Sequence, residues 1–170
     1  MDYSDIIRDV PDWPKKGIIF KDLTTVWKDK KAFKQSMDDF YARYKDIKID
    51  KVVGAESRGF IYASPLAYLL EAGFVPVRKP GKLPYKYIEE QYELEYGVDS
   101  LAMHEDAIEK GDKVLIIDDL IATGGTAEAI VNMVKKLGGE IVEASFFVEL
   151  TFLDGRKKLD GIPVFSIVKV

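Results

Sequence analysis

Residues 113–126 constrain the fold more than any other part of the chain. They begin with a strand-like run that contains four consecutive apolar residues (VLII, 114–117), continue through Asp118 and Asp119, and reach the small-residue run ATGGT at 122–126. Apolar residues in a row, without alternation, predict a strand that is covered on both faces. A helix-forming segment follows. Strand, loop and helix in this order are the repeating unit of an α/β fold with a mainly parallel sheet.

The rest of the chain supplies further units of this kind. We expect strands at 51–55, 74–78, 113–119, 141–150 and 163–168, and helices at 31–44, 60–71 and 127–136. Two more strands, at 91–96 and 100–104, follow a basic Pro/Gly-rich loop at 79–85. The pattern predicts an α/β chain with about five mainly parallel strands and a ligand beyond their carboxyl ends. Because no repeat or linker divides the chain, we expect a single domain over 1–170.

Composition excludes several kinds of chemistry. The chain has no cysteine and a single histidine, His104, so thiolate nucleophiles and two-histidine metal sites cannot be built. His104 lies away from the motifs, and we expect it to be structural or at the surface. The 25 Lys and Arg against 29 Asp and Glu give a net charge of −4, which offers no bulk attraction for nucleic acid or anionic lipid. We therefore expect no nucleic-acid or membrane partner and, without a signal-like start, a cytoplasmic location.

The loop at 122–126 is suited to a single phosphate. Its small residues allow backbone N–H groups to face an anion at the positive end of the following helix, and Thr123 and Thr126 add hydroxyl donors. It contains no lysine and no G-x-G-x-x-G, so it is neither a Walker A loop nor a dinucleotide-binding loop. Asp118 and Asp119 can accept hydrogen bonds from two vicinal hydroxyls; a solvated strand end or a divalent-metal site are the alternatives. Phosphate beside diol indicates ribose 5-phosphate.

The segment VLIIDDLIATGGT at 114–126 resembles the 5-phosphoribosyl-1-diphosphate (PRPP) binding motif of type I phosphoribosyltransferases. Other segments resemble the adenine phosphoribosyltransferase branch: PKKGIIFKD at 14–22, GAESRGF at 54–60, RKPGKLP at 78–84, LEYG at 94–97 and VELTFLDGRKKL at 148–159. Together they span nearly the whole chain in the family's order. The resemblance implies the type I phosphoribosyltransferase fold, with a small N-terminal hood over about residues 1–30 and a mobile flap over about 79–104.

The same resemblance implies an activity in purine salvage. A 5-phosphoribosyl group would pass from PRPP to N9 of adenine, giving AMP and diphosphate. Mg²⁺ is the implied cofactor, and because this ion keeps water and binds substrate phosphates, we expect the substrate to hold most of it and no metal site made by the protein alone. The family also implies a homodimer, in which Arg78 reaches the partner's site.

The PRPP-binding residues implied by the resemblance lie in three segments. They are Glu56, Ser57, Arg58, Arg78, Lys79, Lys82, Asp118, Asp119, Ala122, Thr123, Gly124, Gly125 and Thr126. The segment 55–58 corresponds to the family's diphosphate loop, where members hold a cis peptide bond. Because the bond to the diphosphate breaks through an oxocarbenium-like state, cations must neutralise the leaving group, and Arg58 therefore also counts as catalytic. The alternative for Arg58 is a solvated surface turn.

Two further catalytic residues are implied in the flap. Glu95 is the acid/base candidate at the purine imidazole, and Tyr96 is its partner over the ribose and base. A lid that excludes water would protect the activated sugar from hydrolysis. The alternative for Glu95 is a hairpin position that faces water.

The purine pocket is implied at the hood. Ile19, Phe20 and Lys21 line it, with Phe20 stacking on one face of the base and Leu120 covering the other. Backbone groups of Ile19 and Lys21 read the amino edge. Many relatives carry arginine at the position of Lys21, so we assign Lys21 only backbone and point-charge roles. Core packing is the alternative for Phe20.

Two other functions remain open on the sequence. A PRPP-sensing regulator would keep the sugar site without catalysis, although the negative net charge disfavours DNA binding. A phosphoribosyltransferase for hypoxanthine, guanine or xanthine would keep the reaction and change the base. A panel of purine bases offered with PRPP separates these alternatives.

Overall fold

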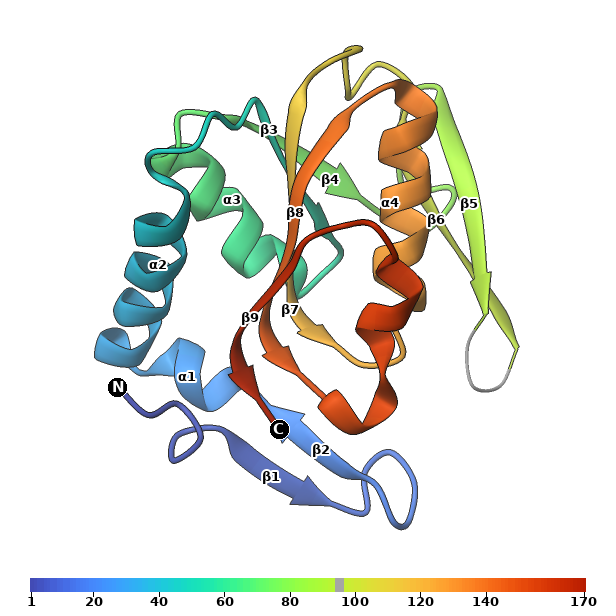
Figure 1. Cartoon of the computed structure of the whole chain (residues 1–170). Coiled ribbons are helices and arrows are strands. Elements are labelled where there is room, and N and C mark those ends of the chain that lie inside the picture. Colours follow the sequence, from blue (N-terminus) through green and yellow to red (C-terminus); the bar gives the residue numbers. More distant parts are fainter. Residues whose placement is uncertain (94–96) are drawn as a thin grey trace.

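A five-stranded sheet forms the centre of the molecule. The computed structural model describes residues 1–93 and 97–170 (Figure 1). The strands of this sheet are β3 (Lys51–Ala55), β4 (Gly73–Val77), β7 (Lys113–Ile121), β8 (Glu140–Glu149) and β9 (Val164–Lys169). They are ordered β4-β3-β7-β8-β9, and every neighbouring pair is parallel. The predicted α/β class and mainly parallel sheet of about five strands are confirmed.

Helices cover both faces of the sheet. They are α1 (Thr24–Lys28), α2 (Lys30–Tyr44), α3 (Gly59–Leu69) and α4 (Gly125–Leu137), and the 3-10 turns η1 (Thr151–Leu153) and η2 (Gly155–Leu159) follow β8. Figure 1 shows α2 and α3 on one side of the sheet and α4 on the other. The loops that follow β3 and β7 therefore emerge at the same edge of the sheet, each running into a helix.

Local sequence signals set the ends of two of these helices. Asp29 caps α2 by accepting hydrogen bonds from the backbone N–H groups of Lys31 and Ala32, at 2.8 and 2.9 Å. Such a cap satisfies donors that have no partner within the helix. The second signal is the glycine at the end of α4. Gly138 follows the helix with a φ of +88°, a left-handed conformation that favours glycine.

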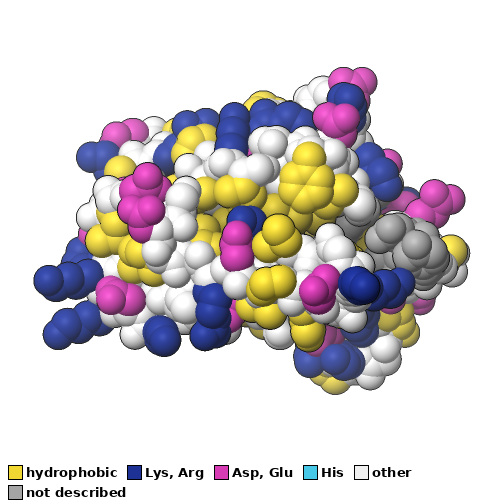
Figure 2. Space-filling view, turned by 90° about the horizontal axis from the view of Figure 1, so that it is seen from below, with side chains coloured by type: hydrophobic (Ala, Val, Ile, Leu, Met, Phe, Trp, Pro, Cys, Tyr) yellow, Lys and Arg dark blue, Asp and Glu magenta, His cyan; other side chains and the backbone are white. Residues whose placement is uncertain are grey.

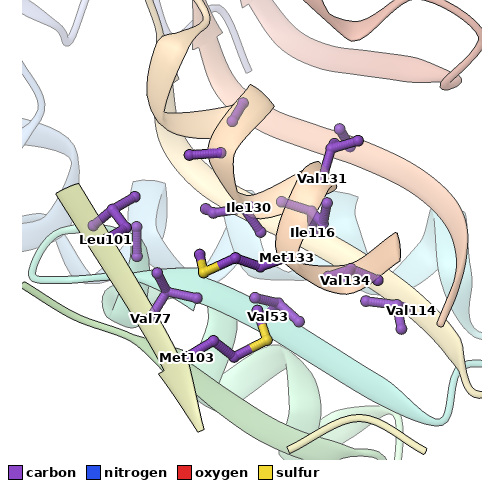
Figure 3. Close-up of a cluster of buried hydrophobic side chains, with 14 of the residues drawn as sticks. Val53, Val77, Leu101, Met103, Val114, Ile116, Ile130, Val131, Met133 and Val134 are labelled. Atoms are coloured by element: carbon purple, nitrogen blue, oxygen red, sulfur yellow. The ribbon is translucent and has the colours of Figure 1, made fainter. Parts of the chain in front are cut away.

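Strand β7 separates two hydrophobic clusters. Ile116 belongs to the cluster under α4, whereas Leu115 and Ile117 belong to the cluster under α2 and α3. Figure 3 shows the first cluster, in which side chains of β3, β6 and β7 meet those of α4. All three β7 residues are fully buried, so the coverage on both faces predicted for this strand is confirmed.

Strand β7 is longer than predicted, and this moves the acidic pair. The expected end was Asp119, but Leu120 and Ile121 still pair with Val148 and Glu149 of β8. The acids therefore lie inside the strand and not at its end, because two more apolar residues continue the ladder. The following helix also begins earlier than predicted, at Gly125, which places the last two residues of the 122–126 run in its first turn.

Two small antiparallel hairpins lie outside the main sheet. One pairs β1 (Arg8–Pro11) with β2 (Ile19–Asp22), and the other pairs β5 (Tyr87–Glu93) with β6 (Val98–His104). No strand was predicted for the first hairpin, because its four-residue strands are rich in charged residues. Its strands are joined by Arg8–Asp22 and Lys21–Asp9 ion pairs.

The second hairpin was predicted with wrong bounds. The sequence placed its first strand at 91–96, but β5 begins at Tyr87, and β6 begins two residues before the predicted 100. Alternate residues of β5 are exposed and half-buried, so its polar face hides the strand pattern. In the described residues, no helix has the length and apolar character needed to cross a membrane.

Candidate functional site

A cavity of about 460 Å³ opens at the edge of the sheet where β3 and β7 end. It is lined by Ala55, Glu56, Ser57, Arg58, Lys79, Tyr92, Leu101, Asp118, Asp119, Leu120, Ile121, Ala122, Thr123, Gly124, Gly125, Thr126, Ala127 and Phe146. Its volume is in the range of small-molecule sites, and its place is the one that the topology predicts for a ligand. Most of the residues predicted to bind PRPP therefore meet at one cavity.

The floor of the cavity is the loop at 122–126 and the first turn of α4. Gly124 precedes the helix with a φ of +84°, and the helix points its unpaired N-terminal N–H groups and positive dipole end at the cavity. Thr123 is exposed and Thr126 half-buried, so both hydroxyls lie near the opening. This arrangement of donors is suited to a phosphate group.

The loop also needs glycine for space. A Cβ atom on Gly124 would lie 2.2 Å from the carbonyl oxygen of Gly155, and a Cβ on Gly155 would lie 2.2 Å from the carbonyl oxygen of Ala122. The backbone of η2 is thus pressed against the loop. Sequence reasoning assigned no role to Gly155, and the only signal available was that it lies in the family-like segment 148–159.

Asp118 and Asp119 form the wall beside this loop. Asp119 is 3% exposed, and its Oδ2 lies 3.0 Å from Nε of Arg58. The alignment is too poor for a hydrogen bond, and Oδ2 has no hydrogen-bond partner among the described residues. Asp118 accepts a hydrogen bond from the backbone N–H of Asp119 at 2.8 Å. Two adjacent carboxylates are therefore held at the cavity with acceptor capacity to spare.

Burial sets the charge behaviour of the acidic pair. It raises the pKa of Asp118 well above its ordinary value, and the neighbouring carboxylate of Asp119 raises it further. Burial also raises the pKa of Asp119, although the guanidinium of Arg58 opposes the change. Hydroxyl donors or a cation bound nearby would stabilise the charged form of both carboxylates.

Gly59 allows a close approach at this wall. It begins α3, and a Cβ at this position would lie 2.7 Å from Oδ1 of Asp118. In the sequence, Gly59 stands out only as part of the segment GAESRGF at 54–60. Its structural role is to let the start of α3 contact the Asp118 carboxylate.

The segment 55–58 also lines the cavity, beside the acidic pair. The peptide bond between Glu56 and Ser57 is cis, as the resemblance implied for this loop. Ser57 and Arg58 are exposed and line the cavity. Arg58 therefore brings a positive charge to this part of the cavity, and its side chain also forms an ion pair with Asp119.

Glu56 holds the basic segment 78–82 beside this loop. Its carboxylate accepts a hydrogen bond from the backbone N–H of Lys79 at 2.5 Å and from Nζ of Lys82 at 3.0 Å. Nη2 of Arg78 lies 3.6 Å from the same carboxylate. In this chain Arg78 and Lys82 are therefore turned to Glu56 and do not line the cavity, whereas Lys79 does.

Lys79 connects the cavity to the second hairpin. Its Nζ pairs with the carboxylate of Asp99 on β6 and lies 3.3 Å from the hydroxyl of Tyr92 on β5. Tyr92 lines the cavity, and sequence reasoning did not single it out, although its place in the alternating strand was available. The predicted catalytic residues Glu95 and Tyr96 lie outside the described residues.

The residues predicted to hold a purine are divided between two places. Leu120 lines the cavity, whereas Ile19, Phe20 and Lys21 on β2 do not. Phe20 lies next to the site, because the guanidinium carbon of Arg58 is 5.6 Å from its ring centre. Nζ of Lys21 donates to Asp9 at 2.7 Å.

The first hairpin carries apolar surface. Ile19 is 57% exposed and Trp13, in the connection between β1 and β2, is 51% exposed. Trp13 packs on Phe20 at a ring distance of 4.4 Å. Seen from below, hydrophobic side chains gather over the middle of this face, and lysine and arginine lie toward its edges (Figure 2).

His104 does not line the cavity. His104 is half-buried and packs edge-on against Tyr85 at 6.3 Å, which fits a structural or surface position. Among the described residues there is no cluster of three or more His, Asp or Glu side chains arranged to hold a metal ion.

Comparisons with known proteins cover the whole of this arrangement. A family model described as phosphoribosyl transferase domain matches residues 27–165. An adenine phosphoribosyltransferase from Geobacter metallireducens is 59% identical over 165 residues, which are 97% of this chain and 96% of the relative. The similarity therefore includes the sheet, both hairpins and every segment that lines the cavity.

Solved structures agree with the sequence matches. The crystal structure of adenine phosphoribosyltransferase from Thermoanaerobacter pseudethanolicus matches with a TM-score of 0.96 at 51% identity, covering 99% of this chain and 98% of that one. The enzyme from Saccharomyces cerevisiae, complexed with an imino-altritol bisphosphate and adenine, matches with a TM-score of 0.92 at 40% identity, covering 98% and 96%. The fold is therefore shared over nearly the full length of each chain.

Proposed function

This chain belongs to the adenine phosphoribosyltransferase branch of the phosphoribosyl transferase family, and we propose that it transfers the 5-phosphoribosyl group of PRPP to N9 of adenine. The products are AMP and diphosphate, and the reaction is a step of purine salvage. The observation that carries the proposal is that one cavity joins the α4 N-terminus, the acids Asp118 and Asp119, and the cation Arg58. These groups match the phosphate, diol and diphosphate of one substrate.

The 5′-phosphate of PRPP binds at the loop 122–126 in this proposal. Backbone N–H groups and the dipole of α4 supply positive potential without a lysine. The ribose hydroxyls then face Asp118 and Asp119, which lie next to the loop on the same strand. Burial raises the pKa of both carboxylates. This supports the assignment, because hydrogen bonds donated by the ribose hydroxyls stabilise the charged carboxylates.

The diphosphate lies toward the segment 55–58. Arg58 and Lys79 both line that side of the cavity, and their charges stabilise the leaving group as the bond to C1′ breaks. Fixing sugar and base in line with the leaving group supplies the rest of the acceleration. Arg78 and Lys82 belong to the same basic segment, held in place by Glu56.

The acid/base role is assigned to Glu95, with Tyr96 over the ribose and base. Tyr92, three residues before Glu95 in the sequence, lines the cavity, which supports a flap over about 79–104. The Glu95 carboxylate would accept the N–H proton of the purine imidazole as the N9–C1′ bond forms and the bond from C1′ to diphosphate breaks. The flap also excludes water from the activated sugar.

The base occupies the space between Leu120 and Phe20. Leu120 lines the cavity, and Phe20 contacts Arg58 from the β1–β2 hairpin, which we propose as the hood over about residues 1–30. Lys21 is paired with Asp9, which supports limiting it to backbone contacts and a point charge. Backbone groups of Ile19 and Lys21 then read the amino edge of adenine.

Mg²⁺ is the cofactor of the proposal. The donors present fit this ion, because carboxylate oxygens are its preferred protein ligands and Oδ2 of Asp119 has no hydrogen-bond partner among the described residues. Asp118 and Asp119 are the residues that would bind the ion, and the substrate would supply most of its ligands. When bound, the ion supplies positive charge to the diphosphate.

A homodimer and a cytoplasmic location complete the proposal. On α3 and β4, Tyr68 is 84% exposed, Leu69 40% and Phe74 37%, and Phe60 packs edge-on against Phe74. Exposed apolar residues on adjoining elements are typical of an interface. Sedimentation of the wild type and of Tyr68→Glu tests the dimer, and a cysteine-free chain suits the reducing cytoplasm.

A panel of bases tests the activity. Purified protein is given PRPP and Mg²⁺ with adenine, hypoxanthine, guanine or xanthine, and nucleotide formation is followed by chromatography. We expect AMP from adenine and little product from the other bases. Product from another base would move the chain to another specificity, and no product from any base would leave the PRPP-sensing regulator as the better reading.

A further inference from the structure

The segment behind the phosphate loop is tied down by an ion pair between the buried carboxylate of Glu149 and the half-buried side chain of Arg156, and the proposed function does not use this pair. Nε and Nη2 of Arg156 donate to the two carboxylate oxygens of Glu149 at 2.7 and 2.6 Å. The same carboxylate accepts a hydrogen bond from Ser166 on β9 at 2.8 Å, and Glu149 is only 6% exposed. Planar, bidentate pairs of this kind fix both position and orientation.

This ion pair is connected to the phosphate loop at both ends. Arg156 follows Gly155 directly, and the Gly155 backbone packs against Ala122 and Gly124 so closely that no Cβ fits between them. At the other end, Glu149 pairs with Ile121 in the β7–β8 ladder. Ile121 is the residue before the loop. The contacts therefore form a closed ring from Ile121 through the loop and Gly155 back to Glu149.

We propose that Glu149 and Arg156 are positioning residues for the 5′-phosphate of the substrate, acting through the Gly155 backbone on the loop 122–126. The inference rests on the proposed function for the identity of that phosphate. Backbone donors bind an anion well only when their directions are fixed beforehand, because reorienting them on binding costs free energy. The ring supplies that fixation without touching the ligand.

Three variants separate positioning from mere stability. Arg156→Met removes the bidentate contact and leaves the buried Glu149 carboxylate without its cation, with the Ser166 hydroxyl still donating to it, which destabilises the fold. The double variant Glu149→Gln/Arg156→Met removes that buried charge as well, so it recovers stability without restoring the ring. Lys157→Met is the matched control on the same turn, because Lys157 and its partner Asp154 are largely exposed.

The readouts are the affinities for ribose 5-phosphate and AMP by calorimetry, the KM values for PRPP and adenine, and the melting temperature. We expect Arg156→Met to weaken ribose 5-phosphate and AMP and to raise the KM for PRPP, each about tenfold, with the KM for adenine unchanged. The double variant regains melting temperature but keeps the weakened phosphate affinity. The control matches the wild type in every measurement.

Two results would overturn the positioning role. One is a double variant whose affinity for ribose 5-phosphate returns together with its melting temperature, and the other is an equal loss for adenine and for the phosphate ligands. The turnover assay reports separately on the proposed function. A wild type that binds ribose 5-phosphate but makes no AMP overturns the function, and the binding comparison still decides the positioning role.

Discussion

Replacing Asp118 by asparagine should stabilise the protein while it damages substrate use. The side chain keeps its shape, and its Oδ1 can still accept the Asp119 N–H that it accepts at 2.8 Å in the wild type. The substitution removes one of two adjacent carboxylates, both with a pKa raised by burial. The wild-type fold therefore bears the cost of a charge that its surroundings disfavour.

The size of the gain follows from that cost. A buried charge that is not directly paired costs up to several kcal/mol, and we expect the amide to recover about 1–3 kcal/mol of it. For a chain of this size, each kcal/mol raises the melting temperature by about 2–4 °C, so the expected gain is about 2–12 °C. Loss of a charged acceptor for a ribose hydroxyl should lower kcat/KM for PRPP by about 10- to 100-fold.

The stability difference between Asp118→Asn and the wild type should depend on pH. The pKa of Asp118 is higher in the folded state than its ordinary value of 3.8, so the wild type gains stability as the pH falls through the folded-state pKa. The advantage of Asp118→Asn is complete above that pKa and shrinks as the pH falls toward 3.8. Thermal unfolding by circular dichroism at pH 8 and pH 4 measures both limits, with Asp160→Asn, at an exposed position, as the control.

Two outcomes would refute this reasoning about Asp118. The asparagine variant could melt at or below the wild-type temperature at pH 8, or its advantage could be the same at pH 4. Either result would mean that the carboxylate is stabilised in the fold by contacts that outweigh its burial and the charge of its neighbour.

The remaining predictions concern the walls and the flap. Glu56→Ala removes the acceptor of the Lys79 N–H and the partner of Lys82, so we expect the KM for PRPP to rise about tenfold in steady-state assays; a lower KM would show that Glu56 only competes with the diphosphate. Gly59→Ala forces a Cβ toward Oδ1 of Asp118, and we expect an increased KM for PRPP with little change in the KM for adenine. Glu95→Ala should lower kcat by about 10²- to 10⁴-fold with a small effect on PRPP affinity, and an unchanged kcat excludes the acid/base role.

The central unit of the fold could be predicted from the sequence because its signals are local and consistent. Four apolar residues in a row can only be buried on both faces, and small residues before a helix leave few alternatives to an anion-binding turn. The end of the strand was harder to predict. Leu120 and Ile121 continue the ladder because β8 offers partners to them, and that partner is far away in the sequence.

The parts that sequence reasoning missed depend on contacts between distant segments. Gly155 has no feature of its own that links it to Gly124, and the pair is recognised only when both backbones are in place. Tyr92 likewise enters the cavity because its hairpin lies against α4, where a Cβ on Gly125 would meet its ring at 3.0 Å. The first hairpin escaped prediction because ion pairs, and not an apolar pattern, join its strands.

The separation of the β1–β2 hairpin from the five-stranded sheet has a consequence for engineering. The β1–β2 hairpin forms its own two-stranded sheet and shares no ladder with the five strands that carry the phosphate loop and the acids. A library in residues 8–22 can therefore vary the part proposed to select the base without shifting the register of any strand in the main sheet. Variants that accept new nucleobases could be selected by changing this hairpin alone, while the residues proposed to bind the sugar and its phosphates stay unchanged.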